Sequence, residues 1–182
     1  MKEGVHVTKQ QFEHYIRQIQ TGDKDGLKEI YNDYITFIYS IIFSIVHNKE
    51  NAEDITSEFF IKLWTAADSY RFGGRHKAWL ASIAHNMAID FLRKYHKENI
   101  VRDIPKTNDN SEDSPENQVI EKMSLKEALT SLEEKEEQII NLKILGQLTF
   151  KEIAKILHMP MGTVTWKYQN GIVKLRRSGY GT

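Results

Sequence analysis

The stretch from Trp79 to Lys97 constrains the fold most strongly, because its apolar residues recur at the spacing of an α-helix. At about 100° per residue, such a pattern places one apolar stripe along a helix, and that stripe must bury against a core. The predicted stripe consists of Leu80, Ile83, Ala84, Met87, Phe91 and Tyr95. The opposite face carries Ser82, Asn86, Arg93 and His96, with Trp79 and Lys97 at one edge. The sequence therefore predicts a helix with one buried face and one polar, basic face.

The polar face of this helix has the residue types that bind nucleic acid. Lysine and arginine neutralise phosphates, amides hydrogen-bond to base edges, and aromatic rings stack on bases. More cations stand close by at Arg75, Lys77, Lys94 and Arg102. A core helix with a solvated basic back would have the same composition, so this face alone leaves both interpretations open.

Charge is segregated along the chain, although Lys plus Arg and Asp plus Glu each number 25. Residues 75–102 hold six cations against two acids, and residues 163–182 hold four cations and no acid. Between these blocks, residues 103–121 carry six acids and one lysine. Two basic blocks separated by an acidic one predict two binding surfaces and a spacer.

Helical periodicity also dominates the rest of the first hundred residues, and strand-like alternation is nearly absent, so we predict an all-α fold. One helix is expected within residues 1–20, one from Leu27 to about His47, and one from an N-cap at Asn51 to about Ala67. The third of these has two apolar faces, one with Ala52, Ile55, Phe59 and Leu63, and a displaced one with Phe60 and Trp64. Such a helix is either wedged between neighbours or half-exposed for a partner.

Residues 103–117 lack aromatic side chains and hold two of the three prolines, which predicts a flexible linker. It separates a first domain, residues 1–102, from a second, residues 118–182. In the second domain, a helix is expected to end near Ser131. The residues from Ser131 to Glu134 fit a capping box that begins the next helix, and Gly146 ends it. The cluster of Glu133, Glu134, Glu136 and Glu137 is expected to be solvated.

The last two predicted helices form a helix-turn-helix pattern. A second capping box, Thr149 to Glu152, begins a short helix, and Pro160 stands at the start of the final one. In such motifs the first residues of the second helix meet base edges in the major groove. The candidates are Thr163, Val164, Thr165, Trp166 and Lys167, followed by Lys174, Arg176 and Arg177 for phosphates. A plain helical bundle can mimic this pattern.

Three segments in this order carry a resemblance to a known family. They are Asn51 to Trp64, Lys77 to Lys94, and Leu132 to Arg177. In the first, Asp54, Glu58 and Phe60 match a motif that reads Asp-x-x-Gln-Glu-x-Phe, with Ser57 in place of the glutamine. The whole chain thus resembles a bacterial RNA polymerase sigma factor of the extracytoplasmic-function (ECF) group, within the sigma-70 family.

The resemblance implies three binding surfaces and their partners. Core RNA polymerase would contact Asp54, Glu58, Phe60 and Trp64. The −10 promoter element would contact Arg75, Lys77, Trp79, Asn86, Arg93, Lys94 and Lys97, with Trp79 alternatively packing the preceding loop. The −35 element would contact Thr163, Val164, Thr165, Trp166, Lys167, Lys174 and Arg176. An anti-sigma factor, of a kind that is often membrane-anchored, is the other implied partner. The expected location is the cytoplasm for a separate reason: the N-terminus has no apolar signal-peptide core, and the longest apolar-rich run, residues 34–46, is too short to span a bilayer.

Departures from the family pattern and two rival classes remain to be weighed. Pro160, Trp166 and Gly171 each replace a residue type that is usual in the family. The first rival is a stand-alone helix-turn-helix regulator that does not act through polymerase. The second is an enzyme, but the chain has no cysteine, no phosphate-binding glycine loop and no histidine pair at metal-ligand spacing. We therefore expect no catalytic activity, cofactor, metal or small-molecule substrate.

Overall fold

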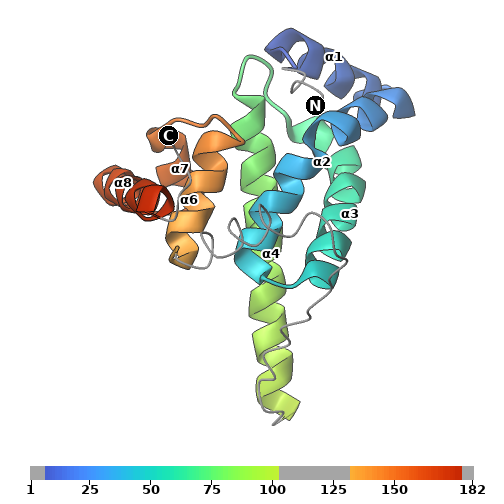
Figure 1. Ribbon diagram of the computed structural model, residues 1–182. Coiled ribbons are helices and arrows are strands. Elements are labelled where there is room, and N and C mark those ends of the chain that lie inside the picture. The colour runs from blue at the N-terminus through green and yellow to red at the C-terminus, as the bar shows by residue number, and fades with distance from the viewer. Residues whose placement is uncertain (1–6, 103–131, 178–182) are drawn as a thin grey trace, which may run out of the picture.

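The computed structural model describes residues 7–102 and 132–177, with side chains to residue 97 in the first range. Its helices are α1 Lys9–Gln20, α2 Lys24–Val46, α3 Lys49–Ala66, the 3₁₀ turn η1 Ala67–Ser69, α4 His76–Arg102, α6 Glu134–Ile144, α7 Phe150–Ile156 and α8 Met161–Arg177 (Figure 1). All regular structure in these ranges is helical, which confirms the predicted class. The predicted linker and the helix expected before Ser131 lie outside the described residues.

Side-chain caps set the helix starts of the first domain. Thr8 Oγ1 accepts a hydrogen bond from the Gln11 N–H at 3.3 Å, and this begins α1. The predicted cap at Asn51 is wrong, because Asn48 caps α3 and its Oδ1 accepts from the Asn51 N–H at 2.9 Å. His47 just before it has φ 49°, in the left-handed region, and ends α2. The chain therefore turns at His47, and α3 begins earlier than predicted.

Helix α2 is the centre of the first domain and packs against α1, α3 and α4. Its isoleucines form a helix as predicted from their spacing, although isoleucine favours strands. The buried isoleucines of this helix are Ile30, Ile38, Ile41, Ile42 and Ile45. Full burial of each such side chain contributes about 1.5–3 kcal/mol relative to exposure. Phe12 of α1, Phe59 and Leu63 of α3, and Leu80 of α4 belong to the same core.

Helix α4 is longer than predicted and buries a shifted face. Leu80 and Ala84 are buried as predicted, and the small residues Ala81 and Ala88 are buried with them. Tyr95, predicted to be in the core, is 50% exposed. The reason is visible in Figure 1, where the C-terminal turns of α4 run past the ends of α2 and α3. The predicted stripe is therefore correct only where neighbouring helices reach it.

In the second domain, the start of α6 differs from the prediction, whereas the start of α7 agrees with it. Helix α6 starts at Glu134, so the box from Ser131 to Glu134 is wrong; instead the Glu133 N–H donates to Glu136 Oε2 at 3.0 Å. The predicted box at α7 is confirmed, because Thr149 Oγ1 accepts from the Glu152 N–H at 3.3 Å. Pro160 directly precedes α8 and accepts from the Val164 N–H at 3.1 Å.

Helices α6 and α8 cross at Gly171. A Cβ on this buried glycine would lie 2.7 Å from Ile140 Cδ1, so the missing side chain admits the neighbouring helix.

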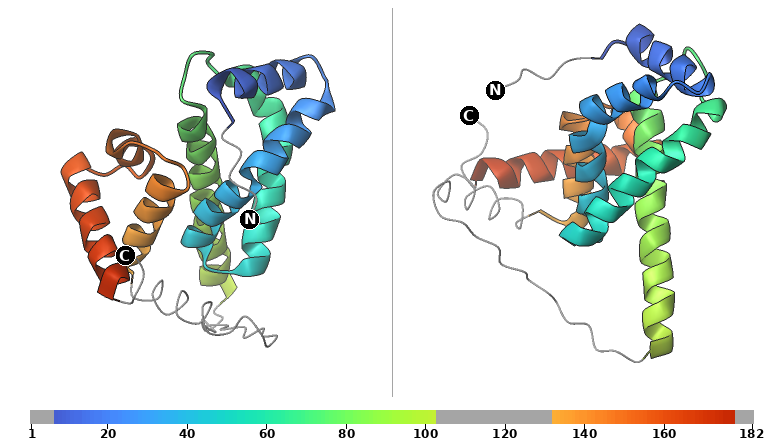
Figure 2. Two further views of the ribbon diagram at one scale, coloured as in Figure 1. Left: turned by 45° about the horizontal axis from the view of Figure 1, so that its top comes forward. Right: turned by 90° about the vertical axis from the view of Figure 1, so that its right-hand side faces the viewer.

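The two domains pack on each other and share one apolar cluster. Helix α6 lies against α2, and α7 lies against α4, as the views in Figures 1 and 2 agree. Within residues 7–102 and 132–177, no helix has the length and apolar character needed to cross a bilayer.

Candidate nucleic-acid interface

The outward face of α3 carries an exposed stripe. Asp54 and Glu58 lie one turn apart and are both exposed, as side chains at i and i+4 share a helix face. Ile61 lies on the same side of the helix, one turn beyond Glu58, and is 73% exposed, which is unusual for so large an apolar side chain. Sequence reasoning missed Ile61, although its spacing of i+7 from Asp54 places it on the same face. We refer to Asp54, Glu58 and Ile61 as the α3 stripe.

The displaced apolar face of α3 is mostly internal. Phe60 is 5% exposed, and its ring lies 4.8 Å from the Tyr31 ring of α2, centroid to centroid. Trp64 is half-buried and packs against the core. From the sequence, this face could be wedged between neighbouring helices or half-exposed for a partner. For Phe60, the structure shows the first of these. These two aromatic residues fix the orientation of the α3 stripe, and Phe60 offers a partner almost no surface.

An aromatic cluster holds the loop between η1 and α4. Trp79 lies 5.0 Å from Tyr70, centroid to centroid, and His76 stacks on Phe12 at 4.6 Å. Trp79 therefore packs the loop, which was the structural alternative for this residue. Burial lowers the pKa of His76 to about 4, so its ring is neutral at pH 7.

Helix α1 also binds the tip of this loop through hydrogen bonds. The Gly73 N–H donates to Glu13 Oε1 at 2.7 Å, and Lys9 Nζ donates to the Gly73 carbonyl at 2.9 Å. Phe72, next to this tip, is 43% exposed and has the Arg17 guanidinium 4.8 Å from its ring centroid. An exposed aromatic ring beside a cation is the kind of platform on which bases stack. Phe72 was not predicted from the sequence, because its only signal was that it is an aromatic residue next to a Gly-Gly pair.

The polar face of α4 forms one exposed row. Asn86, Arg93 and Lys97 are all exposed, and their spacing of seven and eleven residues places them on one side of the helix. Lys94 is exposed about a quarter turn away. Asp90 also lies on this side, and its Oδ1 pairs with Arg93 Nη1 at 3.2 Å. The structure thus brings together an amide and several cations, as predicted, with one acid among them.

The two cations that precede this row have partners in the second domain. Arg75 Nη1 lies 3.2 Å from Glu152 Oε2 of α7, and Lys77 Nζ donates to Gln147 Oε1 at 3.3 Å. Lys77 is half-buried, and burial lowers its pKa. These residues lie at the end of α4 that faces the helix-turn-helix domain.

The recognition helix α8 presents only part of the predicted set. Trp166 is 58% exposed, and Thr163 and Thr165 are partly exposed. Val164 is fully buried, so it has no surface to offer a base, and this corrects its predicted role. Lys167 Nζ pairs with Glu133 Oε2 at 2.9 Å, and the side chain of Glu133 is 63% exposed. Arg176 and Arg177 are exposed at the far end of α8.

Lys174 occupies a different environment from these cations. Its Nζ lies 2.7 Å from Glu136 Oε2, and the Glu136 side chain is only 1% exposed. The expectation of a solvated glutamate cluster is therefore wrong at Glu136. Burial also raises the pKa of the neighbouring Glu137 carboxyl. Because Lys174 neutralises a buried carboxylate, it holds α8 to α6.

Two families match the chain in order. The one described as Sigma-70 region 2 matches residues 30–98, and the one described as Sigma-70, region 4 matches residues 122–175. The ECF RNA polymerase sigma factor SigW of Bacillus subtilis is 29% identical over 174 residues, which cover 89% of this chain and 93% of SigW. SigM of the same organism, another ECF RNA polymerase sigma factor, is 30% identical over 135 residues, with 73% of this chain and 82% of SigM covered.

A solved structure has the same fold. The sigma factor RpoE in complex with the anti-sigma factor NepR, from Bartonella quintana, matches with a TM-score of 0.69 at 21% identity. The match covers 85% of this chain and 96% of that chain.

Proposed function

This chain belongs to the ECF RNA polymerase sigma factors of the sigma-70 family, and from that premise we propose how its residues share the work of initiation. It binds core RNA polymerase and directs promoter-specific transcription initiation through the −10 and −35 elements. We assign residues 1–102 to polymerase binding and the −10 element, residues 103–117 to the linker, and residues 118–182 to the −35 element. The observation that carries this assignment is the exposed polar row of α4 on one domain and the exposed recognition helix on the other.

Polymerase binding is assigned to the α3 stripe. Asp54 and Glu58 supply two exposed carboxylates, and Ile61, one turn beyond Glu58, supplies apolar area that becomes buried on contact. Phe60 and Trp64 act from inside by fixing α3 against the core. A surface that combines apolar area with charged groups is typical of protein interfaces.

The −10 element is assigned to α4 and the loop before it. Asn86 reads a base edge, and Arg93, Lys94 and Lys97 bind the phosphates beside it. Arg75 and Lys77 bind phosphates at the other end of the helix, and Trp79 positions the loop. Capture of a base that has left the stack offsets an unstacking cost of a few kcal/mol. Binding alone then drives promoter melting, and no catalytic step or nucleotide hydrolysis is needed.

The −35 element is assigned to the N-terminal turns of α8. Thr163, Thr165 and Trp166 face the base edges in the major groove, and Lys167 and Arg176 bind phosphates. Val164 and Lys174 hold α8 in place on the side that faces the domain core. Trp166 is the largest of the exposed apolar side chains on α8 and adds contact area to this surface.

The location and the regulatory partner follow from the family. Core RNA polymerase works in the cytoplasm, and we place this chain there with it. An anti-sigma factor holds the chain inactive until a signal releases it, as the fold shared with a sigma factor bound to its anti-sigma factor supports. The stand-alone regulator is not favoured, because it leaves the α3 stripe and the region 2 match without a role.

The test is run-off transcription with purified core polymerase, with mapping of the transcript starts. Asn86→Ala should leave −35 duplex binding nearly intact and reduce promoter opening about tenfold, because a base-edge contact is worth about 1–3 kcal/mol. The defect should shrink on a template whose −10 region is already mismatched. Permanganate footprinting measures opening on the matched and the mismatched template. Normal opening by Asn86→Ala would refute the base-reading role.

A further inference from the structure

A polar stripe of α1 runs beside the segment that leads into α4. Its four members follow one another at spacings of four, four and three residues, which places them on one side of the helix. We call them the α1 stripe, and they are Lys9, Glu13, Arg17 and Gln20. On the adjoining side of α1, Phe12, Ile16 and Ile19 are buried in the core and fix the direction in which the stripe points. Figures 1 and 2 agree that α1 lies beside the loop before α4.

The C-terminal half of the α1 stripe contacts both η1 and the loop of residues 70–75, which we call the α4 loop. Gln20 Nε2 donates to the Ala67 carbonyl at 2.9 Å, where η1 begins. The Arg17 guanidinium lies over the Phe72 ring, 4.8 Å from its centroid. Helix α1 therefore follows this segment from its start to its exposed ring.

The N-terminal half of the stripe fixes the glycine tip of the α4 loop. Gly73 has φ 88°, in the left-handed region, and glycine is the residue with the greatest backbone freedom. Its N–H donates to Glu13 Oε1 at 2.7 Å, and its carbonyl accepts from Lys9 Nζ at 2.9 Å. Hydrogen bonds to ionised groups are stronger than neutral ones, so both backbone groups of this glycine are firmly held.

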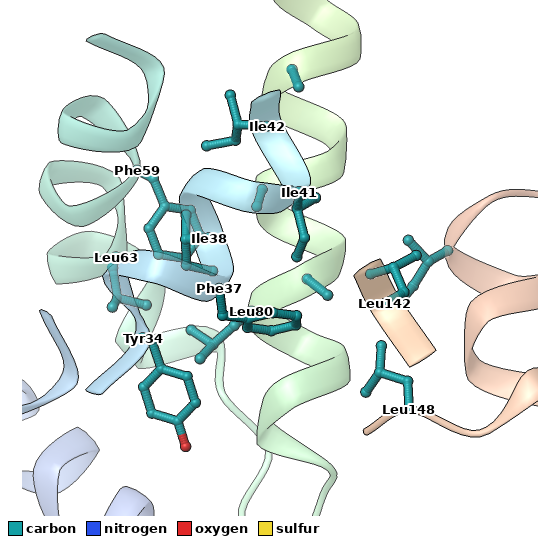
Figure 3. Close-up of a cluster of buried hydrophobic side chains, with 14 of the residues drawn as sticks. Tyr34, Phe37, Ile38, Ile41, Ile42, Phe59, Leu63, Leu80, Leu142 and Leu148 are labelled. Atoms are coloured by element: carbon teal, nitrogen blue, oxygen red, sulfur yellow. The ribbon is translucent and has the colours of Figure 1, made fainter. Parts of the chain in front are cut away.

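The two ends of the α4 loop are anchored in the core, so the contacts of α1 act on its exposed tip. Tyr70 is 5% exposed, and its ring lies 5.4 Å from the Phe12 ring, centroid to centroid. At the other end, Leu80 is buried in the cluster with Tyr34 and Leu63 that Figure 3 shows. Between these anchors, residues 71–75 are all exposed.

The tip that α1 holds has the groups that an unpaired nucleotide requires. Phe72 is 43% exposed, and an aromatic ring stacks on a base of any identity. Arg71 next to it and Arg17 of α1 are both exposed and supply positive charge for a phosphate. This platform is made of two segments that are far apart in the sequence, and its α1 half lies outside residues 30–98, which match Sigma-70 region 2.

We propose that α1 determines how well the α4 loop captures an unpaired base of the −10 element. Glu13 and Lys9 are positioning residues that hold the glycine tip, and Arg17 contacts the nucleotide that stacks on Phe72. Because the tip is already ordered before DNA arrives, the cost of ordering it does not weaken binding. This inference rests on the proposed function, which assigns the −10 element to α4 and its loop.

Glu13 gives the sharpest test, because two explanations of its role predict opposite signs. If it acts only through its charge, Glu13→Ala should tighten binding to DNA. If it holds Gly73, Glu13→Ala should weaken binding of the holoenzyme to a single-stranded −10 oligonucleotide by about three- to tenfold. Glu13→Gln loses the charge but keeps an acceptor oxygen, and should stay within about twofold of wild type. Glu29→Ala, the same change at an exposed position of α2, is the matched control and should bind like wild type.

An abasic scan of the oligonucleotide tests whether these residues act on one stacked base. With wild-type holoenzyme, removal of the base at one −10 position should weaken binding, because the stacking on Phe72 is lost. That penalty should disappear in Phe72→Ala and shrink in Glu13→Ala and Arg17→Ala, with the penalties at other positions kept. Lys9→Ala should weaken binding without lowering its salt dependence, because its ammonium holds Gly73 and not a phosphate.

Amide hydrogen exchange provides a measurement that needs no DNA. The Gly73 N–H should exchange several times faster in Glu13→Ala than in wild type, because its acceptor is gone, and Glu13→Gln should restore most of the protection. Thermal melting and core polymerase affinity check that each variant is folded. If Glu13→Ala is not folded, Arg17→Ala and Phe72→Ala decide the question, because both side chains are exposed.

The outcomes separate the inference from the proposed function. Tighter binding by folded Glu13→Ala, or an equal loss in Glu13→Gln and Glu13→Ala, would overturn the positioning role. An abasic penalty that is the same in wild type, Phe72→Ala and Arg17→Ala would overturn the platform. In each of these cases, promoter opening by the wild-type holoenzyme upholds the proposed function. A wild-type chain that directs no transcription with core polymerase would overturn the proposed function itself.

Discussion

Lys174 should stabilise the fold more than it binds DNA, and Lys174→Ala tests this. Its Nζ lies 2.7 Å from Glu136 Oε2, a carboxylate that is 1% exposed, whereas the Lys174 side chain itself is 34% exposed. Removal of one partner from a fully buried ion pair costs about 3–5 kcal/mol, since the remaining charge stays buried. Water reaches the lysine side of this pair and screens it, so we expect a loss of about 2–3 kcal/mol.

The assay is urea unfolding followed by circular dichroism, with −35 duplex binding measured in parallel. Lys174→Ala should lower the midpoint with little change of slope, because the surface exposed on unfolding stays nearly the same. Arg176→Ala is the matched control, as it removes the same charge from an exposed position on the same helix. Glu136→Gln combined with Lys174→Met should recover part of the loss, because the buried charge is then absent.

The reasoning fails if Lys174→Ala keeps the stability of wild type and instead weakens −35 binding with a smaller salt dependence. That result would place Lys174 on a phosphate, as predicted from the sequence. Loss of stability by Arg176→Ala equal to that of Lys174→Ala would also refute it, because the effect would then come from net charge and not from the buried pair.

Four further outcomes are expected. Asp54→Ala should weaken a core polymerase pull-down and leave the melting temperature unchanged, whereas Phe60→Ala should lower stability by about 3–5 kcal/mol because it empties a core site. Stability should fall as pH drops from about 6.5 toward 4, because burial favours the neutral ring of His76, and His76→Phe should flatten this acid limb in pH-dependent melting. Arg176→Ala should weaken −35 binding and reduce its salt slope by about one counterion in a titration of duplex. Gly26→Ala should destabilise the first domain in urea unfolding.

The helices of the first domain were predictable because their apolar spacing is strong and their ends carry turn signals. The isoleucine stretch of α2 illustrates this, and in the second domain the box at Thr149 is an equally clear end signal. The errors fall where two local signals compete over a few residues. Asn48 and Asn51 are both good caps, and only the left-handed turn at His47 selects the first.

The site was less predictable, because exposure depends on what packs nearby. Phe60 and Ile61 are neighbours in sequence, yet Phe60 is 5% exposed and Ile61 is 73% exposed. Likewise Glu136 is buried among glutamates that the composition predicts to be solvated, because α8 brings Lys174 over it. A residue's type and spacing give its direction on a helix, and only the neighbouring helices decide whether that direction is inside.

Gly26 shows how a contact can reverse the sign of a propensity argument. Judged by sequence alone, Gly26→Ala in the first turn of α2 should gain up to about 1 kcal/mol, because alanine is the better helix former. In the fold, a Cβ at this position would overlap the backbone carbonyl oxygen of Tyr15 in α1 and lie 2.9 Å from Gln18 Cβ. A backbone atom cannot swing aside as a side-chain tip does, so α1 must shift, at a typical overpacking cost of about 1–3 kcal/mol. We therefore expect net destabilisation, and a higher urea midpoint for Gly26→Ala would mean that α1 and α2 do not cross this closely.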